Sequence, residues 1–165
     1  MTALEQIRSL YEYNEWANNH ILDASSELSE EELKRSQGAS FDSIRGNLAH
    51  TVGAQIIWLG RWSGQKSEAL ALLGSGPGLE PVRRAYEMSH DEQKRFVESL
   101  DEQELGRTVP YRDSQGNEQE GVLWKLMIQV VNHGTHHRAE TAMALTALGK
   151  PPRQLDYLFF EQERA

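Results

Sequence analysis

Apolar residues recur at alternating steps of three and four over the first 28 residues, which is the spacing of one face of an amphipathic helix. Two asparagines, Asn14 and Asn18, interrupt this apolar stripe at its centre. Polar residues in such a stripe indicate either a hydrogen-bonded pair in the core or a site that the stripe lines. The pattern predicts a long helix over 1–28, and the Ser and Glu spacing that follows predicts a short helical piece over 29–35.

Three more stretches repeat the helical spacing of apolar residues, at about 41–62, 79–100 and 121–148. Asp42 or Ser43 is the candidate N-cap of the first of these stretches. Gly64 and Gly149 follow the first and the last stretch, where a glycine typically ends a helix. The chain therefore predicts four long amphipathic helices, which would bury their apolar faces by packing into one bundle.

The connections between these helices differ in length and in chemistry. Residues 64–78 are rich in Gly and Ser, and a linker of this length reaches ~50 Å when extended, so the two helices that it joins can run parallel. Between 107 and 122, strand-forming residues flank a Ser-Gln-Gly-Asn turn, which predicts a small β-hairpin. A short docking helix is expected over 154–162. The predicted fold is all-α: a single four-helix-bundle domain over 1–165, with a long connection between helices two and three and a small β-hairpin between helices three and four.

Charge and composition exclude several classes of protein. The 165 residues include 17 basic and 25 acidic ones, and the net charge of −8 argues against a protein that binds nucleic acid by neutralising phosphates. No apolar run approaches the ~20 residues that span a bilayer, and the polar N-terminal stretch predicts no signal peptide. The chain has six His and no Cys. The absence of Cys excludes a disulfide scaffold, a thiolate zinc finger and a cysteine nucleophile. The expectation is a cytoplasmic protein that contacts neither nucleic acid nor a membrane.

The fourth predicted helix carries the most informative motif. His133 and His137 lie one turn apart on the apolar face of this helix, whereas His136 lies on a polar side. Two imidazoles at i and i+4 can bind one metal ion through their neutral lone pairs. The alternative is a pair of hydrogen-bonded core histidines, or an exposed pair. Gly134 stands where an H-E-x-x-H motif has its glutamate, which argues against a metalloprotease.

A third metal ligand would have to come from another helix, and the residues alone leave two candidates. His50 lies in the second long helix, at the edge of its apolar arc. His90 lies inside the apolar stripe of the third long helix, and spacing alone slightly favours it. His20, close to Trp16 on the first helix, is expected to be a surface or boundary residue.

Three separated blocks of the sequence resemble the DinB family, and the resemblance covers nearly the whole chain. The blocks are YEYNEWAN at 11–18, then FDSIRGNLAH at 41–50 with IWLGRW at 57–62, and finally NHGTHHR at 132–138 with LG at 148–149 and PP at 151–152. Three blocks in the same order are far more specific than a single H-x-x-x-H pair. The resemblance implies a four-helix bundle that carries one divalent metal ion on His50, His133 and His137, and so it favours His50 over His90.

Positions 139 and 140 depart from a motif of this family, and the second of them bears on the site. Where relatives commonly have H-H-R-G-Q, this sequence has Glu140 in the last position, three residues after His137. Its carboxylate is a candidate fourth ligand or general base, with an exposed side chain as the alternative. Three neutral imidazoles suit zinc or nickel first, with iron, manganese or copper as alternatives.

A divalent ion on three imidazoles keeps its charge and an open coordination position, which is the pattern of a catalytic site. Some members of the family transfer a low-molecular-weight bacterial thiol, such as bacillithiol or mycothiol. Because this chain has no Cys, a sulfur nucleophile would have to come from such a cosubstrate. The resemblance thus implies a metal-dependent transferase acting on a small-molecule substrate. The alternatives are a metal-dependent hydrolase that uses metal-bound water, and a non-enzymatic, stress-related protein that binds a metal or a small ligand.

Further expectations concern the surroundings of the metal ion and the assembly of the protein. The side chains expected to line a pocket above the ion are Tyr11, Asn14, Asn18 and Trp58, with ordinary bundle packing as the alternative. The resemblance also implies a homodimer. The apolar residues of the 154–162 helix would cover either the bundle or the partner copy.

Overall fold

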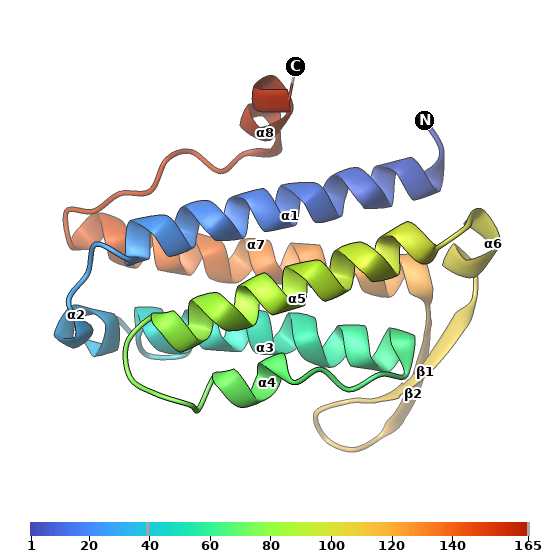
Figure 1. Ribbon diagram of the computed structural model, residues 1–165, viewed down its shortest axis with the longest axis horizontal. Coiled ribbons are helices and arrows are strands. Elements are labelled where there is room, and N and C mark those ends of the chain that lie inside the picture. The colour runs from blue at the N-terminus through green and yellow to red at the C-terminus, as the bar shows by residue number, and fades with distance from the viewer. Residues whose placement is uncertain (39, 165) are drawn as a thin grey trace.

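The computed structural model describes residues 1–38 and 40–164, which form a bundle of four long helices with four short helices and one two-stranded sheet (Figure 1). The long helices are α1 (Ala3–Ser25), α3 (Ile44–Ser63), α5 (Glu80–Ser99) and α7 (Leu123–Ala147). The short helices are α2 (Glu30–Lys34), α4 (Ala69–Leu72), α6 (Glu102–Leu105) and α8 (Tyr157–Arg164), and the strands are β1 (Thr108–Arg112) and β2 (Glu118–Val122). The predicted all-α bundle with a small hairpin is confirmed.

The long helices form a ring in which α7 lies between α1 and α3, and α5 closes the other side. Helices α3 and α5 run in the same direction, and α7 runs opposite to both (Figure 1). The connection over 64–79 therefore returns along the length of the bundle, with α4 part of the way along it, as the predicted long connection requires. Within the described residues, no helix has the length and apolar character needed to cross a membrane.

Both ends of α3 match the predicted capping residues, and the start of α7 differs from the prediction. Ser43, rather than Asp42, caps α3, since its Oγ accepts a hydrogen bond from the backbone N–H of Gly46 at 3.1 Å. Gly64 ends α3 with a φ of 71°. Helix α7 begins at Leu123, two residues later than predicted, because the preceding residues pair with β1.

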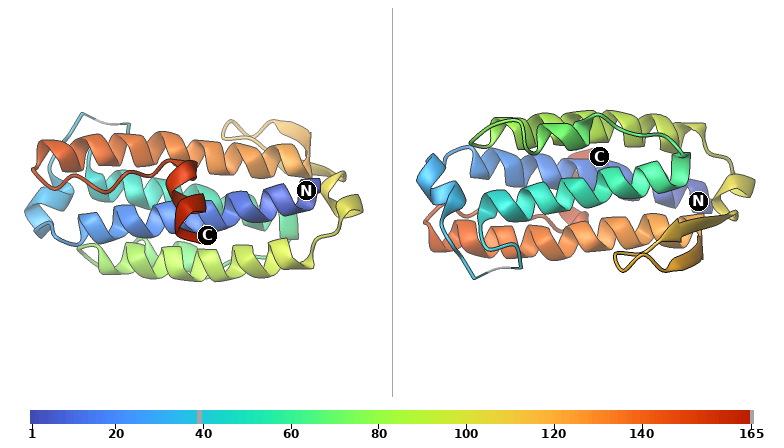
Figure 2. Two further views of the ribbon diagram at one scale, coloured as in Figure 1. Left: turned by 90° about the horizontal axis from the view of Figure 1, so that it is seen from above. Right: turned by 90° about the horizontal axis from the view of Figure 1, so that it is seen from below.

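The hairpin closes one end of the bundle. Strands β1 and β2 pair antiparallel, with Thr108 opposite Val122 and Arg112 opposite Glu118. Val109, on the inner side of β1, is 1% exposed and belongs to the core. The C-terminal helix α8 lies across α1 (Figure 2). The segment expected over 154–162 forms its helix from Tyr157 to Arg164. Of its two expected roles, the structure shows cover of the bundle, because the buried Phe160 packs on Tyr13.

Two apolar clusters fill the bundle, and buried polar side chains lie between them. The cluster on the hairpin side includes Ile7, Trp62, Val97, Val109 and Met127. The cluster on the α2 side includes Ile21, Ile44, Val82, Tyr86 and Leu145. The side chains between them, which we call the polar layer, are Asn14, Asn18, Thr51, Gln55, Ser89, His90, Gln93 and Arg138. The polar interruption predicted in the first helix is therefore part of a layer to which all four long helices contribute.

Candidate metal centre

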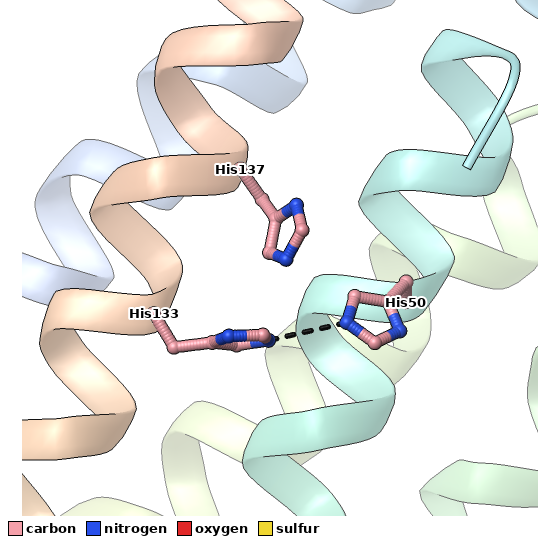
Figure 3. A group of neighbouring side chains, drawn as sticks. All are labelled: His50, His133 and His137. Atoms are coloured by element: carbon pink, nitrogen blue, oxygen red, sulfur yellow. Dashed lines mark hydrogen bonds between the residues drawn. The ribbon is translucent and has the colours of Figure 1, made fainter. Parts of the chain in front are cut away.

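Three histidines from two antiparallel helices point toward one another inside the bundle (Figure 3). Helix α3 supplies His50, and α7 supplies His133 and His137, one turn apart. One ring nitrogen of each residue lies within 4.8 Å of those of the other two. His50, and not His90, is thus the histidine that packing brings to the pair on α7. We call these three residues the histidine triad.

The spacing within the histidine triad fits a metal ion. The Nε2 atoms of His50 and His133 lie 3.2 Å apart. Two imidazole nitrogens bound to one tetrahedral zinc ion, each at 2.0–2.1 Å, would be ~3.3 Å apart. The converging nitrogen of His137 lies within 4.8 Å of both. The donor set therefore suits a divalent transition metal.

Burial favours the neutral form of two of these imidazoles, those of His50 and His133. It lowers the pKa of His50 to about 4, and the neighbouring His137 and His133 contribute to the shift. Burial also lowers the pKa of His133, followed by the effects of His137 and His136. A neutral imidazole offers the lone pair that a metal ion needs, so the two residues are ready to bind an ion at neutral pH.

Asn47, one turn before His50 on α3, holds the ring of His137. Its Nδ2 donates to the carbonyl oxygen of His137 at 2.8 Å and to Thr141 Oγ1 at 2.9 Å, so its Oδ1 faces His137 Nδ1 at 3.0 Å. Because Oδ1 can only accept, Nδ1 of His137 carries the hydrogen. The lone pair of His137 is then on Nε2, the nitrogen with which such a histidine would bind metal.

Two further side chains contact the histidine triad. The ring of Phe41 stacks on His50, with 3.6 Å between centroids and 15° between planes, and meets the edge of His137 at 5.5 Å. Phe41 is 41% exposed, so it covers the histidines on the solvent side. The carboxylate of Glu140 lies at Nδ1 of His137, at 3.0 Å, and is not among the converging donor atoms. This placement favours a supporting role for Glu140 over that of a fourth ligand.

The four side chains expected to line a pocket above the ion make their contacts elsewhere. Tyr11 donates to the carbonyl oxygen of Met127 at 3.3 Å. Asn14 and Asn18 accept hydrogen bonds from the buried guanidinium of Arg138. Trp58 packs on Tyr111 and under Arg61, next to the hairpin. Their observed contacts are those of bundle packing, the alternative given for them.

The other histidines have partners of their own or face solvent. His90 is buried in the polar layer, with its Nε2 3.1 Å from Asn18 Nδ2. The ring of His20 packs against Trp16 at 4.7 Å, on the boundary of the bundle as expected. His136 is exposed on the outer face of α7.

Sequence reasoning did not assign a role to Asn47, Phe41 or Arg138. A signal for Asn47 was present, since it precedes His50 by three residues and so shares its helix face. Phe41 lies in the loop before α3, and no periodicity predicts where a loop side chain points. Arg138 follows His137 directly, but nothing in the sequence indicates that a guanidinium turns into the core.

Two comparisons with known proteins find sequences similar to this chain. The family model described as DinB family matches residues 1–165 of the chain. The chain is also 30% identical over 156 residues to the protein named Protein DinB of Bacillus subtilis (strain 168). The aligned region covers 90% of this chain and 89% of that protein. The family match spans both helices that carry the histidine triad.

Proposed function

This chain belongs to the DinB family, and we propose that it binds one divalent metal ion at the histidine triad and transfers a low-molecular-weight thiol to an electrophilic small molecule. The observation that supports this proposal most directly is the convergence of three imidazoles, two of them held neutral by burial. Zinc or nickel is the first choice for such a donor set, and iron, manganese or copper follow.

Three neutral ligands leave the ion with its full charge and with room for a further ligand. A divalent ion held by His50, His133 and His137 would lower the pKa of a thiol and so supply a thiolate nucleophile at neutral pH. The chain has no Cys, so the thiol comes from a cosubstrate. Its sulfur forms a bond to an electrophilic carbon, the leaving group departs with the electron pair of its own bond, and the thiol proton passes to solvent.

The chain's own residues position the reactants in this proposal. Asn47 keeps the Nε2 lone pair of His137 directed at the site. Phe41 forms an apolar wall against His50 and His137, where it limits the access of water and offers a surface for the apolar part of a substrate.

The test measures, by absorbance, the rate at which 1-chloro-2,4-dinitrobenzene is conjugated with bacillithiol, mycothiol or glutathione. The metal-loaded protein should accelerate conjugation with a bacterial thiol, and both chelation and His50→Ala should abolish the acceleration. A matched control is His20→Ala, which removes a histidine outside the triad and should keep the activity.

Other outcomes contradict the transferase. Metal-dependent hydrolysis of ester or amide substrates without any thiol would support a hydrolase with metal-bound water in its place. A loaded protein that turns over neither kind of substrate would support a non-enzymatic protein that binds a metal or a small ligand.

A further inference from the structure

Both carboxylate oxygens of Glu140 have hydrogen-bonding partners beside the histidine triad. Oε2 lies 3.0 Å from Nδ1 of His137, and Oε1 accepts a hydrogen bond from Ser40 Oγ at 2.6 Å. A glutamate side chain is ordinarily ionised at neutral pH. Here His137 and Ser40 hold the carboxylate in place from two sides.

The carboxylate and the site of the metal ion lie on opposite sides of the His137 ring. Nδ1 faces two acceptors, Asn47 Oδ1 and Glu140 Oε2, each at 3.0 Å, and so it must be the protonated nitrogen. The lone pair on Nε2 then faces the other two histidines. A carboxylate in this place cannot reach the ion, but it acts on the ion through the imidazole.

We propose that Glu140 is a positioning residue that holds His137 in its metal-binding tautomer and adds one negative charge to the site. This inference rests on the metal binding proposed above and is independent of thiol transfer. Carboxylates that accept from a metal-binding histidine fix its ring and make it a stronger donor. Asn47 shares in holding the ring but supplies no charge, so the negative charge is the contribution particular to Glu140.

Two consequences follow from the added charge. Divalent ions are held more tightly, because the carboxylate at Nδ1 makes Nε2 of His137 more basic. Anions are attracted less strongly to the open coordination position, because the charge of the ion is partly balanced. Ser40 ties the loop that also carries Phe41 to the same carboxylate, so Ser40→Ala should weaken both effects in the same direction but less than a change of Glu140 itself.

The experiment measures Co²⁺ affinity by competition with a chromophoric chelator, and then azide binding to the Co²⁺ protein by visible absorption. Glu140→Ala removes both the charge and the acceptor, and affinity for Co²⁺ should fall by about 10- to 100-fold. Glu140→Gln keeps an acceptor and removes the charge, so Co²⁺ should bind more weakly by a smaller factor while azide binds more tightly. Glu87→Gln, at an exposed position on α5, is the matched control and should change neither.

Each result is decisive. A Co²⁺ affinity of Glu140→Ala within twofold of the unmodified protein overturns the positioning role and leaves the metal site intact. Weaker Co²⁺ binding with unchanged azide binding in Glu140→Gln overturns the electrostatic part. If the unmodified protein binds no Co²⁺, the metal site itself fails, and the inference fails with it.

Discussion

The buried guanidinium of Arg138 begins a chain of hydrogen bonds across the bundle. It donates to Asn18 Oδ1 at 2.9 Å, so the amide nitrogen of Asn18 must donate to His90 Nε2, 3.1 Å away. His90 is thus an acceptor on Nε2 and neutral. Burial, followed by the positive charge of Arg138, lowers the pKa of His90 to about 4. Protonation of His90 would break the last bond of the chain and place a second cation in the core.

This pKa predicts a loss of stability in mild acid. An unfolded histidine takes up a proton near pH 6.5, whereas folded His90 does so only near pH 4, so the free energy of unfolding falls between these values as the pH is lowered. The contribution lost is about 3 kcal/mol. His90→Gln can still accept from Asn18 and does not titrate.

Urea unfolding of both metal-free proteins between pH 7 and pH 4 tests this expectation. The stability of His90→Gln should depend less on pH, and the difference between the two proteins isolates His90 because both retain His50. Parallel pH curves for the two proteins would show that His90 titrates normally.

At the residue scale, periodicity predicts the helix face of a side chain but not its partner on another helix. That is why His133 and His137 could be chosen from spacing, whereas His50 and His90 could not be separated without the family resemblance. Their separation depends on which helices are neighbours, since α3 packs on α7 and His90 lies within the polar layer. The hydrogen bonds of Asn47 and Glu140 to His137 depend on the same packing.

Helix α7 approaches α1 closely at Gly134. A Cβ atom there would lie 2.8 Å from Arg138 Nη1 and 3.1 Å from Asn14 Oδ1. Arg138 cannot move aside without breaking its buried hydrogen bonds to α1. Because Gly134 has no side chain, the guanidinium of Arg138 has room in the core.

We predict that Gly134→Ala destabilises the protein by about 1–3 kcal/mol through overpacking, although alanine is the better helix former. Gly53→Ala on α3 is the control, because its Cβ would meet only side-chain atoms, at 3.5 Å or more. That variant should gain ~0.5–1 kcal/mol from helix propensity. Thermal unfolding of the two variants measures the contrast, and equal stabilisation of both would disprove the close contact at Gly134.

At the element scale, the four long helices and the hairpin were predictable because apolar spacing and turn residues encode them locally. The short helices α4 and α6 were not predicted, since each has only four residues and too little sequence to show a period. The first helix was expected to reach residue 28 but ends at Ser25. Leu28 continues the apolar spacing, yet it is buried from the turn that follows the helix.

In the whole molecule, the polar layer divides the core into two apolar clusters. Buried polar groups cost free energy unless they are hydrogen-bonded. Every side chain of the layer makes at least one hydrogen bond, although Asn14 Nδ2 and Gln55 Nε2 make none. The sequence indicated the part of this layer that lies on α1, Asn14 and Asn18. It did not indicate that these two side chains contact Arg138 and His90. Both apolar clusters include residues of α3 and α7, on either side of the histidine triad, and their packing fixes the spacing of the three imidazoles.

We also predict that the protein is a homodimer, as the family resemblance implies. On α8, Phe160 is buried but Leu158 is 62% exposed, and on α7 Met143 is 75% exposed. Light scattering after gel filtration should give about twice the 18.8 kDa of the chain, and Leu158→Glu should shift the mass towards that of one chain if α8 contributes to the contact. If the unmodified protein has the mass of a single chain at micromolar concentration, the prediction of a homodimer is wrong.

The most direct test of the metal centre is elemental analysis of protein purified without a histidine tag, together with His50→Ala and His137→Ala. Circular dichroism first establishes that each variant is folded, and His20→Ala serves as a histidine-removal control. We expect about one divalent transition-metal ion per chain in the unmodified protein and in the control, and a loss of most of it in both triad variants. Full metal content in either triad variant would contradict the assignment of His50, His133 and His137 as the ligands.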